Sequence, residues 1–233
     1  MRAADLKSGR RRKGWSQAQL ANRLHVGQSY VAMLETGKRS LPLSLARKAV
    51  KALGLPPSAL PHSGWEPGRQ RAVHPQVLAE HLAALGYPGF AHLRSRRWHR
   101  NPAEVLLTAL GQHELEARAV EALPWVLVEY PGMDAEWLAQ QAKLSNLQNR
   151  LGFLASLASQ VAARTKPVGD SSHAALTNLR NALEESRLAT EGTLGRVPSE
   201  PERRWLRENR PAEAKHWNLL TDWRMEMLPY AGR

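Results

Sequence analysis

The sequence predicts an all-α protein in two parts, a small part over residues 1–62 and a larger part over residues 76–233. Apolar residues recur every three or four positions along most of the chain, which is the period of an amphipathic helix. Almost no stretch alternates polar and apolar residues as a strand would. Proline and glycine gather between residues 56 and 68, so we expect a linker over residues 63–75.

The first part is predicted to contain about five short helices. Ser16 is placed to cap the second helix, Gly27 precedes the third, and Gly37 follows its end, where a left-handed residue is favoured. Pro42 suits the first turn of a fourth helix. The apolar positions that define these helices are Leu6, then Leu20, Ala21 and Leu24, then Val31 and Leu34, then Leu45, Ala49 and Leu53.

The second part is predicted to be helical throughout. Asn101, Pro102 and Glu104 give a clear helix start, with a capping side chain, a proline in the first turn and a reciprocal acid. The expected helices cover residues 75–86, 101–111, 113–130, 134–143, 145–164, 171–188 and 199–228.

One apolar face in the second part has two interpretations. Its residues recur every three or four positions from Leu144 to Val161 and are Leu144, Leu147, Leu151, Leu154, Ala158 and Val161. Such a helix either lies in the interior of the larger part or forms the contact between two copies of the chain.

The positive charge of the chain is concentrated at one end. The formal net charge is +12, and residues 1–71 hold 14 Lys and Arg against 3 Asp and Glu, a balance of +11. Residues 72–233 hold 19 against 18, a balance of +1. A small domain with this excess is typical of proteins that bind a polyanion, with nucleic acid as the first candidate and an anionic membrane surface as the second.

The composition also excludes several classes. Without cysteine there is no disulfide framework and no cysteine-based zinc site. No window reaches the roughly 18 apolar residues of a membrane span, and no signal peptide is recognisable, so we expect a cytoplasmic protein with no membrane partner.

Residues 5–57 carry a family resemblance. Its marks are Arg10, Gln17, the Leu20-Ala21 pair, the Val26-Gly27 turn, Val31 and Leu34, Glu35-Thr36-Gly37 and Leu53-Gly54. Together they resemble the Xre/Cro-like helix-turn-helix family of phage and bacterial repressors. The resemblance implies a lambda-repressor-like domain whose third helix enters the major groove of DNA. The family usually has a small polar residue where Gly27 stands, so the cap of the third helix is expected to be looser here.

The recognition helix can be divided into two faces. At 100° per residue, Tyr30, Val31 and Leu34 cluster on one side, and the opposite side is expected to read bases. The predicted base-reading residues on that opposite side are Gln28, Ser29, Ala32 and Met33. Gln28 is the best reader among them, because an amide both donates to and accepts from the adenine edge.

The residues around that helix are predicted to position the DNA backbone. The resemblance implies that Gln17 contacts a phosphate and that Arg10 pairs internally with Glu35. Their locations make Arg11, Lys13, Lys38 and Arg39 further phosphate candidates. Any of these cations outside the interface would be ordinary solvated charge.

The function expected from the sequence is sequence-specific binding of double-stranded DNA by a transcriptional regulator. A repressor that acts as a homodimer on a pseudo-palindromic operator fits the motif best. One alternative is an antitoxin, in which residues 76–233 bind a toxin while the first part controls the shared promoter. Another is a general nucleic-acid or membrane-surface binder. A basic cluster, Arg94, Arg96, Arg97 and Arg100, either touches DNA or a partner or is a solvated loop.

Catalysis has little support in the sequence. His113-Glu114 begins like a zinc-protease motif, but Ala117 stands where the motif needs its second histidine. No phosphate-binding loop, dinucleotide fingerprint or nucleophile elbow is present. We therefore expect no enzyme activity, no metal and no cofactor.

Overall fold

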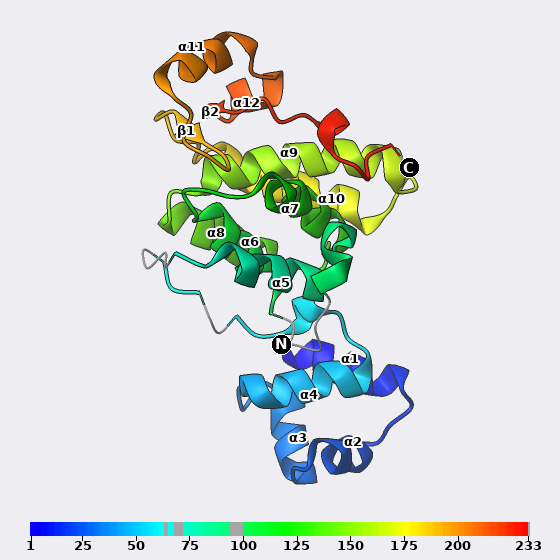
Figure 1. Ribbon diagram of the computed structural model, residues 1–233. Coiled ribbons are helices and arrows are strands. Elements are labelled where there is room, and N and C mark those ends of the chain that lie inside the picture. Colours follow the sequence, from blue (N-terminus) through cyan, green and yellow to red (C-terminus); the bar gives the residue numbers. More distant parts are fainter. Residues whose placement is uncertain (63–64, 68–71, 94–99, 233) are drawn as a thin grey trace. The chain divides into compact units, whose positions relative to one another are not determined.

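The computed structural model describes residues 1–62, 65–67, 72–93 and 100–232, and nearly all of its regular structure is helical (Figure 1). The predicted all-α class is confirmed. The chain forms two compact units; the first boundary between them along the chain falls within residues 63–75, and a short segment that ends at Asn101 returns to the N-terminal unit. The described residues of the N-terminal unit are 1–62, Arg100 and Asn101, and those of the C-terminal unit are 65–67, 72–93 and 102–232.

The N-terminal unit packs its helices around one small apolar core. Its elements are α1 (Ala3–Arg12), α2 (Gln17–Leu24), α3 (Gln28–Glu35), α4 (Leu43–Leu53) and a 3₁₀ turn, η1 (Pro57–Ala59). Both α1 and α2 pack against α3 and against α4. Leu6, Leu20, Val31 and Ala49 meet in the core and are almost completely buried. These short helices agree with the sequence prediction for this part.

The C-terminal unit is a layered helical bundle with α9 at its centre (Figure 1). Trp65, from the predicted linker, already packs against its core. No helix in the part of the chain that the structure describes combines the length and the apolar character needed to cross a bilayer. In chain order the elements are α5 (Pro75–Leu85), η2 (Pro88–Leu93), α6 (Pro102–Leu110), α7 (Ala117–Glu129), α8 (Ala135–Leu144), α9 (Gln148–Thr165), α10 (Ser171–Glu184), β1 (Gly192–Thr193), α11 (Glu200–Asn209), α12 (Ala212–His216), β2 (Leu219–Leu220) and η3 (Met225–Met227).

Helix α9 is an interior helix. It packs against α7 on one side and α10 on another, and Leu151, Leu154 and Ala158 are fully buried. Leu144, the first member of the predicted apolar face, lies instead at the end of α8 and is 59% exposed. Because the apolar face of α9 is covered within one chain, its interpretation as a dimer-forming helix is wrong.

The prediction of one helix over residues 199–228 is also wrong. Helix α11 ends at Asn209 because Arg210 precedes Pro211 and is held in extended backbone, as residues before proline usually are. The chain then forms the short helix α12, the strand β2 and the 3₁₀ turn η3. Strand β2 pairs in parallel with β1, with Gly192 beside Leu219 and Thr193 beside Leu220.

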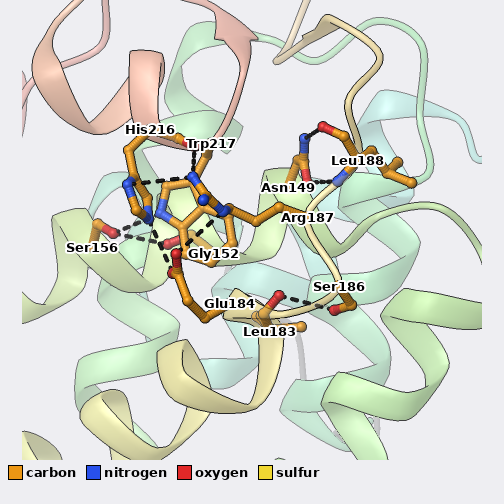
Figure 2. A network of polar contacts seen from close by, with 10 residues as sticks. All are labelled: Asn149, Gly152, Ser156, Leu183, Glu184, Ser186, Arg187, Leu188, His216 and Trp217. Atoms are coloured by element: carbon orange, nitrogen blue, oxygen red, sulfur yellow. Dashed lines mark hydrogen bonds and ion pairs between the residues drawn. The ribbon is translucent and has the colours of Figure 1, made fainter.

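Two other predicted helices are shorter in the structure. Helix α7 begins at Ala117 rather than at residue 113, since the Leu115 amide donates to the carbonyl of Gly195 and holds the preceding segment away from the helix. Helix α10 ends at Glu184 rather than at residue 188. Beyond it, Asn149 of α9 bonds the backbone of Leu188 twice, accepting at 2.8 Å and donating at 3.0 Å (Figure 2).

Candidate nucleic-acid interface

Helices α2 and α3 are joined by a tight turn, and their starts are capped differently. Ser16 Oγ accepts from the Gln19 amide at 3.1 Å, and Gln19 Oε1 accepts from the Ser16 amide at 2.7 Å, so a capping box begins α2. His25 ends α2 in the left-handed conformation with φ of 57°. Gly27 then precedes α3 without any side-chain cap, which is the looser start that the sequence predicts.

The inner side of α3 is held by aliphatic packing. Val31 and Leu34 are buried, and they meet Leu20 and Leu24 of α2 in the apolar core of the unit. Burial of a side chain of this size stabilises the folded state by about 1.5–3 kcal/mol relative to leaving that side chain exposed. This packing of its inner side fixes the position of α3 in the N-terminal unit.

The outer side of α3 is open. Gln28 and Ser29 are exposed, and Ala32 and Met33 are half-buried. Within the described residues, neither the Gln28 amide nor the Ser29 hydroxyl has a hydrogen-bond partner. The four side chains that the sequence predicts as base readers therefore lie on one side of α3, and the two polar ones have no hydrogen-bond partner among the described residues.

A part-buried ion pair links α1 to the end of α3. Arg10 Nε and Nη2 donate to the two carboxylate oxygens of Glu35 at 2.6 and 2.9 Å, and Arg10 Nη1 donates to the Trp15 carbonyl at 2.7 Å. Burial acts to raise the pKa of Glu35, but hydrogen bonds from Arg10 and Gln17 outweigh it and hold that pKa below its ordinary value. The hydrogen bond to Glu35 raises the pKa of Arg10. These are the two residues for which the family resemblance implies a pair.

Gln17 takes part in the same network. Its Nε2 donates to Glu35 Oε2 at 3.0 Å, an interaction that the sequence reasoning missed. No direct signal for this contact is present in the sequence, because Gln17 and Glu35 lie 18 residues apart on different helices. Glu35 was also already assigned as the partner of Arg10. An amide nitrogen carries two hydrogens, so Gln17 Nε2 keeps a second hydrogen that has no partner among the described residues. Glu35 orients that donor.

Four predicted phosphate-contacting cations lie at the end of α1 and after the end of α3. Arg11 and Lys13 stand at the end of α1, and Lys38 and Arg39 follow the end of α3. All four are exposed, and within the residues that the structure describes none forms an ion pair or a side-chain hydrogen bond. Their positive charges are therefore not balanced by an acidic side chain among the described residues, and they are accessible to a bound anion.

The turn after α3 is rigid enough to place Lys38 and Arg39. Thr36 Oγ1 donates to the Ala32 carbonyl at 2.9 Å, and Gly37 adopts φ of 72°, a value that favours glycine. The Arg39 amide then donates to the Met33 carbonyl at 3.3 Å. The backbone of this cationic turn is thus tied to the recognition helix itself.

Trp15 serves as a packing residue in the N-terminal unit. It is half-buried against the apolar core, and the Arg23 guanidinium lies 4.1 Å from its ring centroid. Such a cation–π contact is worth about 0.5–1 kcal/mol at an exposed site. It fixes one side of α2 but adds no side chain to the open face of α3.

The remaining sequence candidates do not form a second site in the described part of the chain. Arg94, Arg96 and Arg97 lie outside the described residues, and Arg100 is exposed. His113 and Glu114 lie in the loop before α7 rather than on a helix. Among the described residues, no group of three or more His, Asp and Glu could hold a metal ion.

Comparison with known proteins identifies one segment. Residues 6–60 match the family model described as helix-turn-helix, and these residues contain α1 to α4 almost completely. This bears out the resemblance of the N-terminal part to Xre and lambda-repressor-like proteins. Neither the curated proteins nor the solved structures contain a match to the chain.

Proposed function

We propose that this chain, whose N-terminal unit is a DNA-binding helix-turn-helix domain, regulates transcription by placing α3 in the major groove of a specific operator. The observation that carries the proposal is the open face of α3. Its polar groups, on Gln28 and Ser29, have no hydrogen-bond partner among the described residues, while Val31 and Leu34 on the opposite face are buried. A helix whose inner side packs against its own domain and whose outer side is exposed can enter a major groove.

Gln28 is the proposed main base reader. As the first residue of α3 it is exposed, and a glutamine amide can pair bidentately with N6 and N7 of adenine. Ser29 bonds a neighbouring base edge or phosphate. Ala32 and Met33 offer apolar surface to thymine methyl groups, which explains how a helix with few polar residues still discriminates sequence.

The surrounding residues position the DNA backbone. The N-terminus of α2 directs backbone amides and the remaining Gln17 donor toward one phosphate, where the helix dipole also favours an anion. Arg11, Lys13, Lys38 and Arg39 supply sequence-independent attraction. The balance of +11 in residues 1–71 supports this division of roles.

A homodimer is the proposed active form, and repression is the proposed outcome. Two such domains read half-sites about 34 Å apart, one DNA turn, so a dimer bound over a promoter blocks it. Because α9 is interior, the dimer contact is assigned to another surface of the chain. A second protein that copurifies with the chain and changes its operator affinity would instead favour an antitoxin.

Selection of bound sites from random duplex DNA with the whole chain tests the function. The expected result is a pseudo-palindrome with half-site centres about ten base pairs apart. Enrichment of no sequence would contradict specific recognition.

The role of Gln28 is tested on the selected site and on random DNA. Gln28→Ala is expected to weaken binding to the selected site by about 1–3 kcal/mol and binding to random DNA far less, because it removes base contacts only. Asn22→Ala is the matched control, since Asn22 is an exposed amide on α2 with no assigned role. Equal losses on both DNAs would rule out base reading by Gln28.

A further inference from the structure

A cavity opens in the C-terminal unit where its two strands end. Because β1 and β2 run parallel, the segments that follow them leave the pair at the same end. Leu194 and Gly195 follow β1, Thr221 and Asp222 follow β2, and all four line a cavity of about 300 Å³. The ends of parallel strands are a recurrent place for ligands, since the chain diverges there and leaves room between its two branches.

Several buried residues that line this cavity are apolar. Val120, Leu194 and Leu206 line it and are buried, and Leu220 closes it from β2. Nearer the opening, Trp223 and Met227 also line the cavity and are more accessible. A lining of this kind favours a compact apolar or aromatic group of a small molecule.

The acidic group of the cavity is uncommitted. Asp222 is half-buried, and within the described residues its carboxylate has no hydrogen bond or ion pair. The neighbouring Thr221 is 3% exposed, and its Oγ1 accepts from the Trp223 amide at 3.3 Å. The carboxylate therefore stands at an apolar wall with its acceptor capacity unused.

The basic group of the cavity is already neutralised. Arg196 Nη1 donates to Glu202 Oε1 at 2.8 Å. This hydrogen bond is the main cause that lowers the pKa of Glu202 to about 2, so the pair stays ionised across the working pH range. Asp222 is therefore the charged lining residue that has no partner among the described residues.

We propose that this cavity binds a small organic cation, an amine with an apolar or aromatic body. The body occupies the space between Leu206, Leu220 and Trp223, and the ammonium group donates to the Asp222 carboxylate. An aromatic ring beside a carboxylate suits an organic cation, because both groups attract positive charge. The inference concerns the C-terminal unit and does not depend on the proposed function of the N-terminal unit.

Three indole probes of different charge test the proposal by calorimetric titration of the full chain. The probes are tryptamine, which is cationic, 3-methylindole, which is neutral, and indole-3-propionate, which is anionic. Tryptamine is expected to bind tightest and indole-3-propionate weakest. Equal or tighter binding of the acid, or no heat from any of the three, would overturn the proposal.

Two variants locate the site. Asp222→Asn is expected to weaken tryptamine at least about ten-fold and to leave 3-methylindole unchanged, because it removes the charge and keeps the shape. Ala117→Trp places a large side chain at the rim, where Ala117 is exposed, and is expected to weaken both probes. Glu208→Gln on α11 removes an exposed carboxylate with no assigned role and serves as the matched control. Unchanged tryptamine affinity in Asp222→Asn contradicts the assignment, and circular dichroism of each variant shows that it is folded.

Discussion

The two units of this chain differ in how some of their cations are paired. In the C-terminal unit, several cations are paired within the structure: Arg207 and Arg210 share Glu191, and Arg187 contacts Glu184 at 3.2 Å. In the N-terminal unit, Arg10 is paired and half-buried, whereas Arg11, Lys13, Lys38 and Arg39 have no partner among the described residues. Exposed ion pairs add little to the free energy of unfolding. We therefore relate the difference in charge pairing to the molecules that each surface binds rather than to stability.

The largest predicted effect is the loss of a fully buried side chain from the core of the C-terminal unit. Trp217 is fully buried, its Nε1 donates to Ser156 Oγ at 3.0 Å, and its ring lies directly against Gly152 (Figure 2). Trp217→Ala is expected to lower the unfolding free energy by about 3–5 kcal/mol, measured by urea denaturation. Trp205→Ala, which removes a tryptophan that is 54% exposed, should change it by no more than about 0.5 kcal/mol. Similar losses in both variants would contradict this view of the core.

In the N-terminal unit the corresponding element is the ion pair behind α3. Arg10→Met leaves the Glu35 carboxylate buried without its main partner and should destabilise α1 and α3 by about 3 kcal/mol, measured by hydrogen exchange of these helices. Because the folded pKa of Glu35 lies below its ordinary value of 4.5, its contribution is present above that pH and is lost as the pH falls through the folded pKa. Glu35→Gln should remove this pH dependence. A wild-type protection profile that is flat below pH 4.5 would be evidence against it.

The unpaired cations give a smaller effect that appears only with DNA. The double variant Lys38→Ala, Arg39→Ala should reduce the slope of log affinity against log salt by about 1.8, if each residue releases one counterion. Fluorescence anisotropy on one duplex at several salt concentrations measures this slope. Lys143→Ala with Lys215→Ala removes two exposed cations of the C-terminal unit and should leave the slope unchanged. The charge comparison fails if both double variants shift the slope equally.

The smallest predicted effect concerns the uncapped start of α3. Gly27 has φ of −73°, and a Cβ added there meets only Ser29 Oγ at 3.8 Å. Gly27→Ser should therefore stabilise α3 by a few tenths of a kcal/mol through an N-cap, seen as slower hydrogen exchange. Gly37→Ser is the matched control, because φ of 72° makes the same substitution cost about 1 kcal/mol. A loss at both positions would mean that Gly27 is needed for its conformation.

The sequence predicted the N-terminal unit well because its determinants are local. Ser16 and Gln19 form their capping box within one turn, and Val31 and Leu34 lie one turn apart on α3. Determinants that are distant in sequence were harder to predict. The contact between Gln17 and Glu35 joins two helices, and the pairing of Gly192 with Leu219 joins strands of only two residues. Pro211 was a readable signal that the helix predicted over residues 199–228 must break.

The central claim is that the outer face of α3 lies against DNA bases, and the absence of cysteine allows a direct measurement. A single cysteine at position 29 (Ser29→Cys) or at position 22 (Asn22→Cys), labelled with an iron chelate, cleaves whichever DNA backbone lies beside it. Strong cleavage inside each half-site from position 29, and little from position 22, is the predicted result at equal occupancy in a gel-shift assay. Cleavage from position 22 alone, or equal cleavage from both, would contradict the account.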